Sequence, residues 1–307
     1  MRGDGLSRET FRRTLKEKSK PSSKKPPSKS HAGEIIQVAK SPVVTVASTT
    51  PIYDAIQKMT KEGFRRIPIA NPGTKALEGI ITATDIVDYL GGGKKFEIVE
   101  QRFGGNFFKA LNQSIGIIMT KNVVSVNISA KISEAIELMK EKKLGGLPVV
   151  DDGNSVKAII TERDIASLFA DRISDIRVSQ IMSENVLTAL PKTTIFEVEK
   201  TMVTQGFRRL PIVSDGKVMG IITTMDIIRF FGSGDVFKHL RSGTIIQILN
   251  TPALQIATKE ILTIELNANV GKAAKIMRDK NIGAMPVVEK EKLVGIITER
   301  DFFKIIE

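Results

Sequence analysis

The chain has 307 residues and 41% of them are apolar, so it is long enough for two domains with cores of their own. It contains no cysteine and only His31 and His239, which excludes disulfides and thiolate metal sites and disfavours a histidine metal site or a histidine-based catalytic triad. No apolar run approaches the ~18 residues of a membrane span. The charged N-terminus also lacks the apolar segment of a secretory signal, so we expect a cytoplasmic protein.

The net charge of +12 is concentrated at the N-terminus. Residues 1–31 hold ten Lys or Arg and three acidic residues, which leaves a net charge of only +5 for the rest. Lys, Ser and Pro dominate this stretch, and its few apolar residues cannot offset the entropy lost on ordering. We therefore expect a disordered basic tail over 1–32. It could tether a nucleic acid or an acidic partner, or it could be a solubilising extension.

Four similar units follow the tail, and each contains an apolar run that leads into Thr-x-x-Asp. The units cover 36–92, 116–172, 178–233 and 247–307, and their aspartates are Asp85, Asp164, Asp226 and Asp301. A repeat of this kind determines the whole architecture.

The units alternate in sequence. The first and third share Gly-Phe-Arg-Arg before a strand proline, whereas the second and fourth share Ile-Thr-Glu-Arg-Asp. This order indicates that a pair of units was itself duplicated. It predicts two domains, residues 33–174 and residues 175–307.

Each unit shows the same succession of elements. A short β-branched strand (43–46 in the first unit, 123–126 in the second) precedes a helix whose apolar residues recur with the helical period. A strand through the proline, a turn and a strand ending at the repeated Thr come next, and the final helix begins near the repeated Asp. The predicted fold is therefore mixed α/β, with four β-α-β-β-α units, and extra segments lie at Gly91–Ser114 and Gly232–Thr244.

The Thr-x-x-Asp pattern has two interpretations. Thr at the N-cap and Asp three residues later form a capping box, which satisfies backbone donors and suits the helix dipole. A carboxylate at a helix start can equally accept the hydroxyls of a ribose, and the Thr hydroxyl can add a further bond. Both interpretations apply to all four copies, because duplication copies structural caps as well as sites.

At this point the chain resembles a known family. The apolar-Gly-Ile-Ile-Thr-x-x-Asp segments, the Arg-Arg-Leu-Pro-Ile and Gly-Gly-Leu-Pro-Val-Val strands and the β-α-β-β-α order are similar to those of cystathionine-β-synthase (CBS) domains, arranged in two tandem pairs called Bateman modules. The resemblance covers residues 36–307. It is greatest to archaeal four-CBS proteins that are similar to the γ subunit of AMP-activated protein kinase.

This resemblance implies that adenosine nucleotides bind in clefts between paired units. It assigns the ribose to the motif residues, namely Asp85, Asp164, Asp226, Asp301, Thr82, Thr161, Thr223 and Thr298. It assigns the adenine to the region of the first strand, namely Val44, Thr45, Val124, Ser125, Leu187, Thr188, Leu262 and Thr263, which could equally be core residues. Four CBS units would form one disc, so a single chain could complete it, and a dimer of discs is also possible.

Arginines point to the class of ligand, because the planar guanidinium suits phosphate. The first and third units carry a pair of arginines before the strand proline, and the other two carry one just before the motif Asp. The phosphate candidates are Arg65, Arg66, Arg208, Arg209, Arg163 and Arg300, and surface ion pairs are the alternative for each. These charges favour AMP, ADP or ATP over S-adenosylmethionine, whose sulfonium gains nothing from them.

Nothing in the sequence indicates catalysis. Gly91-Gly92-Gly93-Lys94-Lys95 follows a helix and lacks the hydroxyl of a phosphate-binding Walker loop, and no GxGxxG pattern occurs. We therefore expect neither catalytic cofactor nor metal, and a regulatory protein that senses adenylates and reports to an unidentified protein partner. The alternatives are a nucleic-acid-associated protein that uses residues 1–31 as a basic arm, an S-adenosylmethionine-binding CBS protein and a metal-dependent nucleotide hydrolase.

Overall fold

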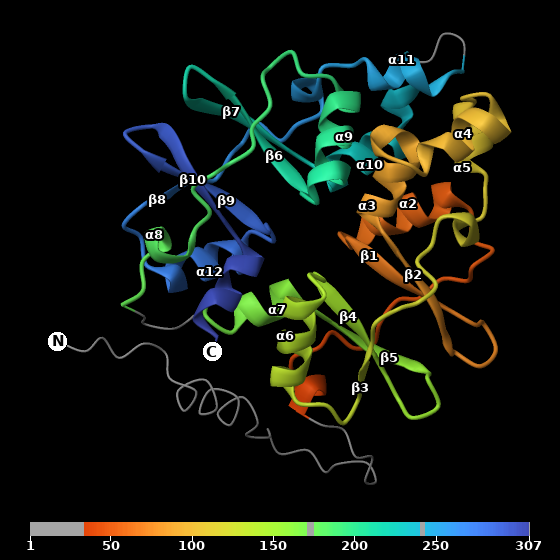
Figure 1. Ribbon diagram of the computed structural model, residues 1–307, viewed down its shortest axis with the longest axis horizontal. Coiled ribbons are helices and arrows are strands. Elements are labelled where there is room, and N and C mark those ends of the chain that lie inside the picture. The colour runs from red at the N-terminus through yellow and green to blue at the C-terminus, as the bar shows by residue number, and fades with distance from the viewer. Residues whose placement is uncertain (1–33, 171–174, 240–242, 307) are drawn as a thin grey trace. The chain divides into compact units, whose positions relative to one another are not determined.

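The computed structural model describes residues 34–170, 175–239 and 243–306, and Figure 1 shows the helices and small sheets of the four repeats. The predicted tail over 1–32 lies outside the described residues. In the part of the chain that is described, no helix is long and apolar enough to cross a membrane.

The elements follow the chain in the order of the repeats. The first repeat and the segment before it contain η1 (Glu34–Gln37), α2 (Ile52–Glu62), β1 (Arg66–Ala70), β2 (Leu77–Thr82), α3 (Ala83–Val87) and the π-helical turn η2 (Asp88–Gly92). Two short helices connect it to the second repeat, α4 (Phe96–Phe103) and α5 (Phe107–Leu111). The second repeat contains η3 (Ile115–Ile117), β3 (Val126–Asn127), α6 (Ile132–Glu141), β4 (Gly146–Val150), β5 (Val156–Thr161) and α7 (Glu162–Ser167).

The second half repeats this order. The third repeat contains α8 (Val178–Ile181), α9 (Ile195–Gln205), β6 (Arg209–Ser214), β7 (Lys217–Thr223) and α10 (Thr224–Gly232). The connection holds η4 (Gly234–His239) and α11 (Ile245–Leu249). The fourth repeat contains η5 (Ala253–Gln255), β8 (Ile264–Glu265), α12 (Val270–Asp279), β9 (Ala284–Glu289), β10 (Lys292–Thr298) and the 3-10 helix η6 (Glu299–Ile305).

The predicted β-α-β-β-α order is confirmed, but the first strand is shorter than expected. In the second repeat β3 begins only at Val126 and pairs in parallel with β4. In the first repeat the predicted strand over 43–46 reduces to a single parallel bridge from Val46 to Ile69. The chain before these residues is extended without a sheet partner, since only the end of the segment reaches the neighbouring strand.

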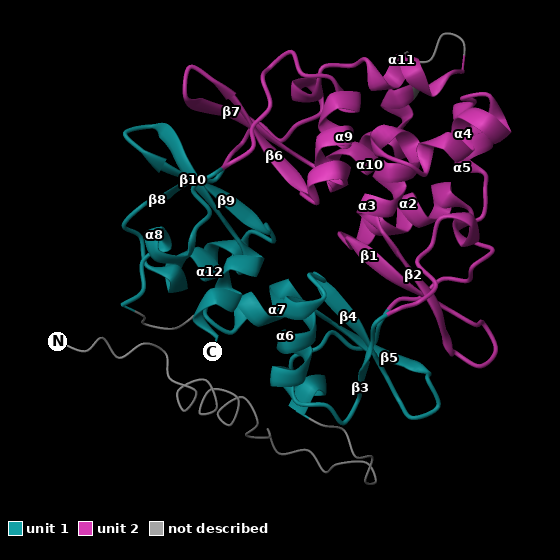
Figure 2. Ribbon diagram, in the orientation of Figure 1, with its two compact units in different colours: residues 1–43, 124–185, 262–307 teal, residues 44–123, 186–261 magenta. Residues whose placement is uncertain are grey.

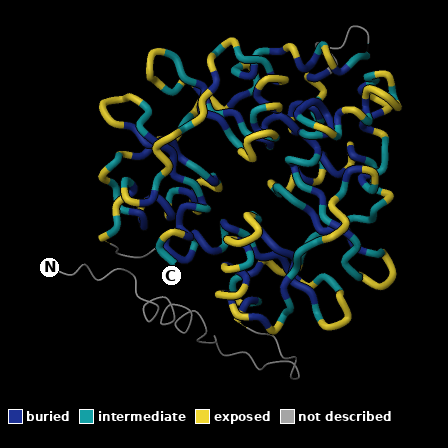
Figure 3. Tube along the Cα trace, in the orientation of Figure 1, coloured by how far each residue is buried: buried dark blue, intermediate teal, exposed yellow. Residues whose placement is uncertain are grey.

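An antiparallel hairpin lies at the centre of each repeat, and its register places the motif Thr at the end of the second strand. Thr82 stands opposite Arg66 across β1 and β2, and Thr223 stands opposite Arg209 across β6 and β7. The hairpin turns are exposed whereas the strands are largely buried (Figure 3). Each hairpin therefore delivers its motif to the start of the next helix.

The helix after the first strand buries the face that the sequence predicts. Ile52, Ala55, Ile56 and Met59 of α2 are fully buried, as is the matching face of α6. Gly63 ends α2 in the left-handed conformation with φ 69°, which glycine adopts without strain. Burying such side chains contributes about 1.5–3 kcal/mol each, so this face anchors the repeat.

The chain divides into two compact units, shown in different colours in Figure 2. Unit 1 holds residues 1–43, 124–185 and 262–307, which include most of the second and fourth repeats, and unit 2 holds residues 44–123 and 186–261, which include most of the first and third. The compact units thus group alternate repeats, whereas the predicted domains group consecutive repeats. The reason is that the helices of alternate repeats pack together, as α10 does on α2 within unit 2.

Short leading segments are exchanged between consecutive repeats. Ile35 and Ala39 are buried with the helix α6 of the second repeat, and Lys40 bridges Ile159 in β5. In return, Thr120 at the start of the second repeat bridges Ile80 in β2. Ser183 and Thr258 do the same for the third and fourth repeats. The chain thus links the repeats of each predicted pair, and the domain bounds 33–174 and 175–307 stay a prediction.

Glycines allow η2 to lie close to α9 within unit 2. A Cβ on Gly92 would lie 2.7 Å from a methyl group of Val203 and 2.9 Å from the carbonyl oxygen of Glu199. The backbone atom cannot move aside cheaply, so we expect Gly92→Ala to lower the free energy of unfolding by about 1–3 kcal/mol, the usual cost of overpacking. Urea denaturation would measure the loss. Gly234→Ala is the matched control, since a Cβ there meets no atom within 4 Å. Equal stability of the two variants would contradict the prediction.

Candidate functional site

All four Thr-x-x-Asp motifs form capping boxes at helix starts, so the structural interpretation of the motif is confirmed. In the third repeat, Oδ2 of Asp226 accepts hydrogen bonds from the Thr223 N–H at 2.9 Å and from the Thr223 hydroxyl at 2.7 Å. The same two bonds join Thr82 to Asp85, Thr161 to Asp164 and Thr298 to Asp301, at 2.6 to 2.9 Å.

The two oxygens of each motif carboxylate have different roles. Oδ2 is occupied by the cap, and Oδ1 takes no part in the cap. A charged acceptor at this place can take hydroxyl hydrogen bonds of about 1.5–3 kcal/mol each. The cap and a ribose therefore need not compete for the same oxygen, and both interpretations of the motif can hold together.

In three repeats Oδ1 faces a basic side chain that the sequence analysis missed. Lys95 Nζ lies 2.5 Å from Oδ1 of Asp85. Arg229 Nη1 lies 3.0 Å from Oδ1 of Asp226, and Lys304 Nζ lies 2.8 Å from Oδ1 of Asp301. The i,i+3 spacing on a helix could have revealed the last two. The position of Lys95, ten residues after its aspartate, depends on a turn that the sequence does not specify.

Asp164 differs from the other three motif aspartates. Among the described residues, its Oδ1 has no basic partner, and Ser167 occupies the position three residues later. Burial raises the pKa of this carboxyl, with the negative Glu299 adding to the effect, while the Thr161 hydrogen bonds and Arg163 oppose it. The four motifs are thus unequal in charge.

The strand arginines lie next to the motif. The Arg65 carbonyl accepts a 2.9 Å bond from the N–H of Ala83 at the start of α3, and the Arg208 carbonyl accepts the equivalent 3.0 Å bond from Thr224. Arg66 and Arg209 follow as the first residues of β1 and β6. All four side chains are partly buried, and each takes part in an interaction of its own. Their phosphate role stays a prediction.

Arg163 and Arg300 form reciprocal ion pairs inside unit 1. Arg163 Nε donates to Glu299 Oε1 at 2.7 Å, and Arg300 Nε lies 3.0 Å from Glu162 Oε1. Both glutamates are almost fully buried, with 2% and 1% of their surface exposed. Arg163 also donates to the side chain and carbonyl of Asn281. These contacts match the ion-pair alternative. The buried glutamates went unnoticed, although the shared Glu-Arg of these two repeats was a signal.

The predicted adenine region is half-buried or exposed. Val44, Thr45, Val124 and Ser125 are partly buried, and Leu187, Thr188, Leu262 and Thr263 are exposed. The core alternative is therefore wrong for the last four residues. They lie just before the bridge from Ala189 to Ile212 in the third repeat and just before β8 in the fourth, and their adenine role stays a prediction.

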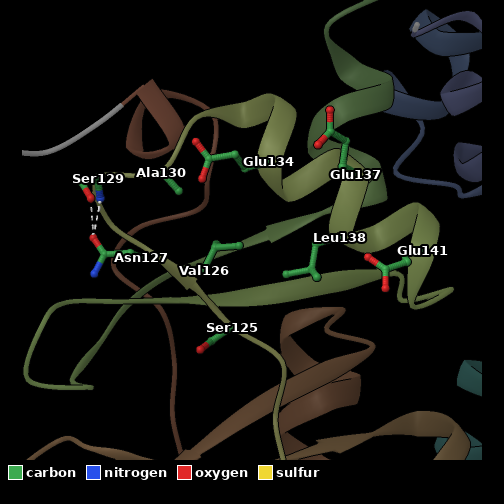
Figure 4. Close-up of a pocket in the computed structure, with 9 residues that line it drawn as sticks. All are labelled: Ser125, Val126, Asn127, Ser129, Ala130, Glu134, Glu137, Leu138 and Glu141. Carbon is green, nitrogen blue, oxygen red and sulfur yellow. Dashed lines mark hydrogen bonds between the residues drawn. The ribbon is translucent and has the colours of Figure 1, made fainter.

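A groove of about 540 Å³ lies beside Ser125, between the first strand and α6 of the second repeat (Figure 4). Glu134, Glu137 and Glu141 line it, and Ser129 donates to Asn127 at its rim. Three carboxylates would repel a phosphate, so this groove does not suit a nucleotide. Among the residues that the structure describes, no three His, Cys, Asp or Glu side chains are grouped so that they could hold a metal ion.

Known proteins similar to this chain indicate its family. The sequence model of the CBS domain matches residues 32–92, 115–171, 178–233 and 253–307. A protein of Methanocaldococcus jannaschii called uncharacterized protein MJ1225 is 39% identical over 264 residues, which are 85% of this chain and 94% of the relative. An uncharacterized 33.4 kDa protein of the ribosomal RNA operon of Thermofilum pendens is 34% identical over 260 residues, 85% of this chain and 86% of the relative.

Solved structures agree with these relatives. The crystal structure of MJ1225, proposed as an archaeal homologue of γ-AMPK, has a TM-score of 0.85 and 37% identity, and the match covers 89% of this chain and 99% of that one. A conserved protein of Pyrococcus horikoshii shares the fold, with a TM-score of 0.57 and 19% identity over 88% of this chain and 98% of its own. The predicted resemblance is confirmed, and no catalytic family is indicated. The chain belongs to the CBS domain family and contains four CBS domains.

Proposed function

We propose that this protein is a non-catalytic regulatory protein that binds AMP, ADP or ATP at the four motif carboxylates. The observation that carries the proposal is the position of Oδ1: each cap uses Oδ2 alone, and in three repeats a basic side chain lies beside the other oxygen. A ribose hydroxyl needs the carboxylate, and a phosphate needs the cation. The 37% identical MJ1225, proposed as a homologue of γ-AMPK, supports an adenylate ligand and an energy-sensing role.

A role in regulation requires that the ligand favours one of two arrangements of the protein. We propose that a protein partner receives the signal through contact with a surface of this chain. A monomer that forms one disc, or a dimer, fits the same function. The basic side chains beside three of the carboxylates favour phosphorylated ligands over S-adenosylmethionine, because they would repel its sulfonium.

The test is calorimetric titration of the full chain with AMP, ADP, ATP and S-adenosylmethionine, repeated on Asp226→Asn. Asparagine can still accept the N–H of Thr223, so the cap is kept while the charge is lost. We expect adenylate affinity at that repeat to fall roughly 10-fold to 150-fold, the cost of about 1.5–3 kcal/mol for a charged hydrogen bond.

Asp215→Asn is the matched control, because it removes the same charge from the exposed β6–β7 turn of the same repeat. Unchanged affinity in Asp226→Asn would return this carboxylate to a capping role alone. Tighter binding of S-adenosylmethionine than of any adenylate would favour the alternative ligand. Salt-sensitive binding of nucleic acid that disappears on deleting residues 1–31 would favour the basic arm.

A further inference from the structure

Lys95 contacts the first motif although it lies outside the repeat pattern. Its ammonium is 2.5 Å from Oδ1 of Asp85 and 3.9 Å from Oδ2 of Asp88, and 28% of its side chain is exposed. It is therefore accessible to a solute while being held by two carboxylates. Lys94, its neighbour, is exposed.

The backbone around Lys95 is fixed by the turn after η2. The Lys95 N–H donates to Oδ1 of Asp88 at 3.0 Å, and the Gly93 N–H donates to the Asp88 carbonyl at 3.3 Å. A side chain on Gly93 would collide with Oδ1 of Asp88, so the glycine leaves room for this bond. Asp88 and Gly93 therefore fix the backbone of this turn in a conformation from which the Lys95 side chain contacts Asp85.

The same juxtaposition recurs in two other repeats by a different route. Arg229 and Lys304 reach Oδ1 of their own motif aspartates from three residues further along the helix. Asp88 occupies that position in the first repeat, so a cation cannot come from there, and Lys95 supplies it from the turn. A cation thus reaches the equivalent atom by two different routes, the i,i+3 position in two repeats and the turn after η2 in the first, which indicates a shared task.

We propose that Lys95 binds the phosphate of an adenosine nucleotide whose ribose is held by Asp85. Resting on the proposed function, this assigns Lys95 as the residue that makes the first repeat select phosphorylated ligands. An ammonium has three donors, so one can stay on Asp85 while the others bind phosphate oxygens. Arg229 and Lys304 serve the third and fourth repeats in the same way.

The experiment compares AMP with adenosine, which lacks the phosphate, on wild type, Lys95→Met and the control Lys94→Met. The methionine keeps the length of the side chain and removes its charge. We expect Lys95→Met to weaken AMP at one class of sites by roughly 10-fold to 100-fold and to leave adenosine unchanged or slightly tighter. Lys94→Met should match wild type, and Lys95→Arg should restore most of the AMP affinity.

The other outcomes overturn the inference. If both AMP and adenosine bind more tightly to Lys95→Met, the lysine only competes with the ribose for Asp85. If neither affinity changes while the melting temperature falls, Lys95 only stabilises the turn. If wild type binds neither AMP nor adenosine, the proposed function itself fails, which the wild-type titration alone reveals.

Discussion

Replacing Arg163 with methionine is expected to lower the free energy of unfolding by about 3 kcal/mol. The substitution leaves the Glu299 carboxylate, which is 2% exposed, without the guanidinium 2.7 Å away. Removing one partner of a buried ion pair typically costs 3–5 kcal/mol, because the remaining buried charge loses its counter-ion and is not solvated instead. Arg163 is itself 28% exposed, so water relieves part of the cost and the lower end applies.

Urea denaturation of Arg163→Met beside Arg278→Met checks this result. Arg278 belongs to the same unit and pairs with Asp279, but the two side chains are 36% and 46% exposed, so losing that pair should cost less than about 1 kcal/mol. The double variant Arg163→Met/Glu299→Met should recover most of the lost stability, because it removes the buried negative charge of Glu299 as well. Similar stabilities of the two single arginine variants would show that the Arg163–Glu299 pair contributes little.

The same variant separates the two interpretations of Arg163. A large loss of stability with unchanged AMP affinity would make Arg163 and Arg300 structural, as their ion pairs with buried glutamates suggest. A large loss of AMP affinity with little change in stability would support the predicted phosphate role. The distinction matters because the second and fourth repeats lack the paired strand arginines of the other two.

Local features of this protein could be predicted from the sequence, because they depend on neighbouring residues. The capping box joins residues three apart, so Thr-x-x-Asp was enough to place all four helix starts. The buried face of α2 follows from the spacing of Ile52, Ala55, Ile56 and Met59, which one helical turn brings together. Four copies of such local signals made the CBS fold predictable.

Features that depend on packing between distant segments could not be predicted. Lys95 reaches Asp85 through the turn that Asp88 and Gly93 hold, and nothing in the spacing of ten residues requires it. The pairing of Glu162 with Arg300 depends on how the second and fourth repeats pack. The first strands were predicted too long because β-branched residues favour strands, yet a strand also needs a neighbour, and only Val46 bridges one in the first repeat.

Glu199 is a further residue that the sequence analysis missed, and an apolar substitution of it should stabilise the protein. It stands on α9 where the equivalent positions of the other repeats hold Ile56, Ile136 and Ala274. The side chain is fully buried, and neither carboxyl oxygen has a hydrogen-bond partner among the residues that the structure describes. Burial raises its pKa well above the ordinary value, so the folded protein keeps this carboxyl protonated to a higher pH than the unfolded chain does.

We expect Glu199→Met to raise the free energy of unfolding at pH 7 by about 2 kcal/mol, within the 1–3 kcal/mol that burying an unpaired polar group costs. Methionine matches the length of glutamate and lacks a branch that could strike Gly91, where the carboxyl oxygen already lies close. The buried isoleucine at the equivalent position of α2 indicates that this environment accepts an apolar side chain.

The pH dependence gives a second, independent measurement. In the unfolded chain Glu199 ionises near its ordinary pKa of 4.5, whereas in the folded protein it stays protonated to a higher pH. The folded state therefore holds the extra proton, and the stability that it contributes is present at low pH and is lost as the pH rises above 4.5. The advantage of Glu199→Met over wild type should accordingly grow with pH, by at most about 1.4 kcal/mol per pH unit.

Glu199→Gln is the matched variant that separates charge from polarity. It removes the titration but keeps a buried amide without a partner, so it should lose the pH dependence while gaining less stability than Glu199→Met. Urea denaturation of the three proteins between pH 5 and pH 8 gives both quantities. A methionine variant that is less stable than wild type across this range would mean that the carboxyl of Glu199 has a stabilising partner in the folded protein. An unchanged pH slope in both variants would place the titrating group elsewhere in the chain.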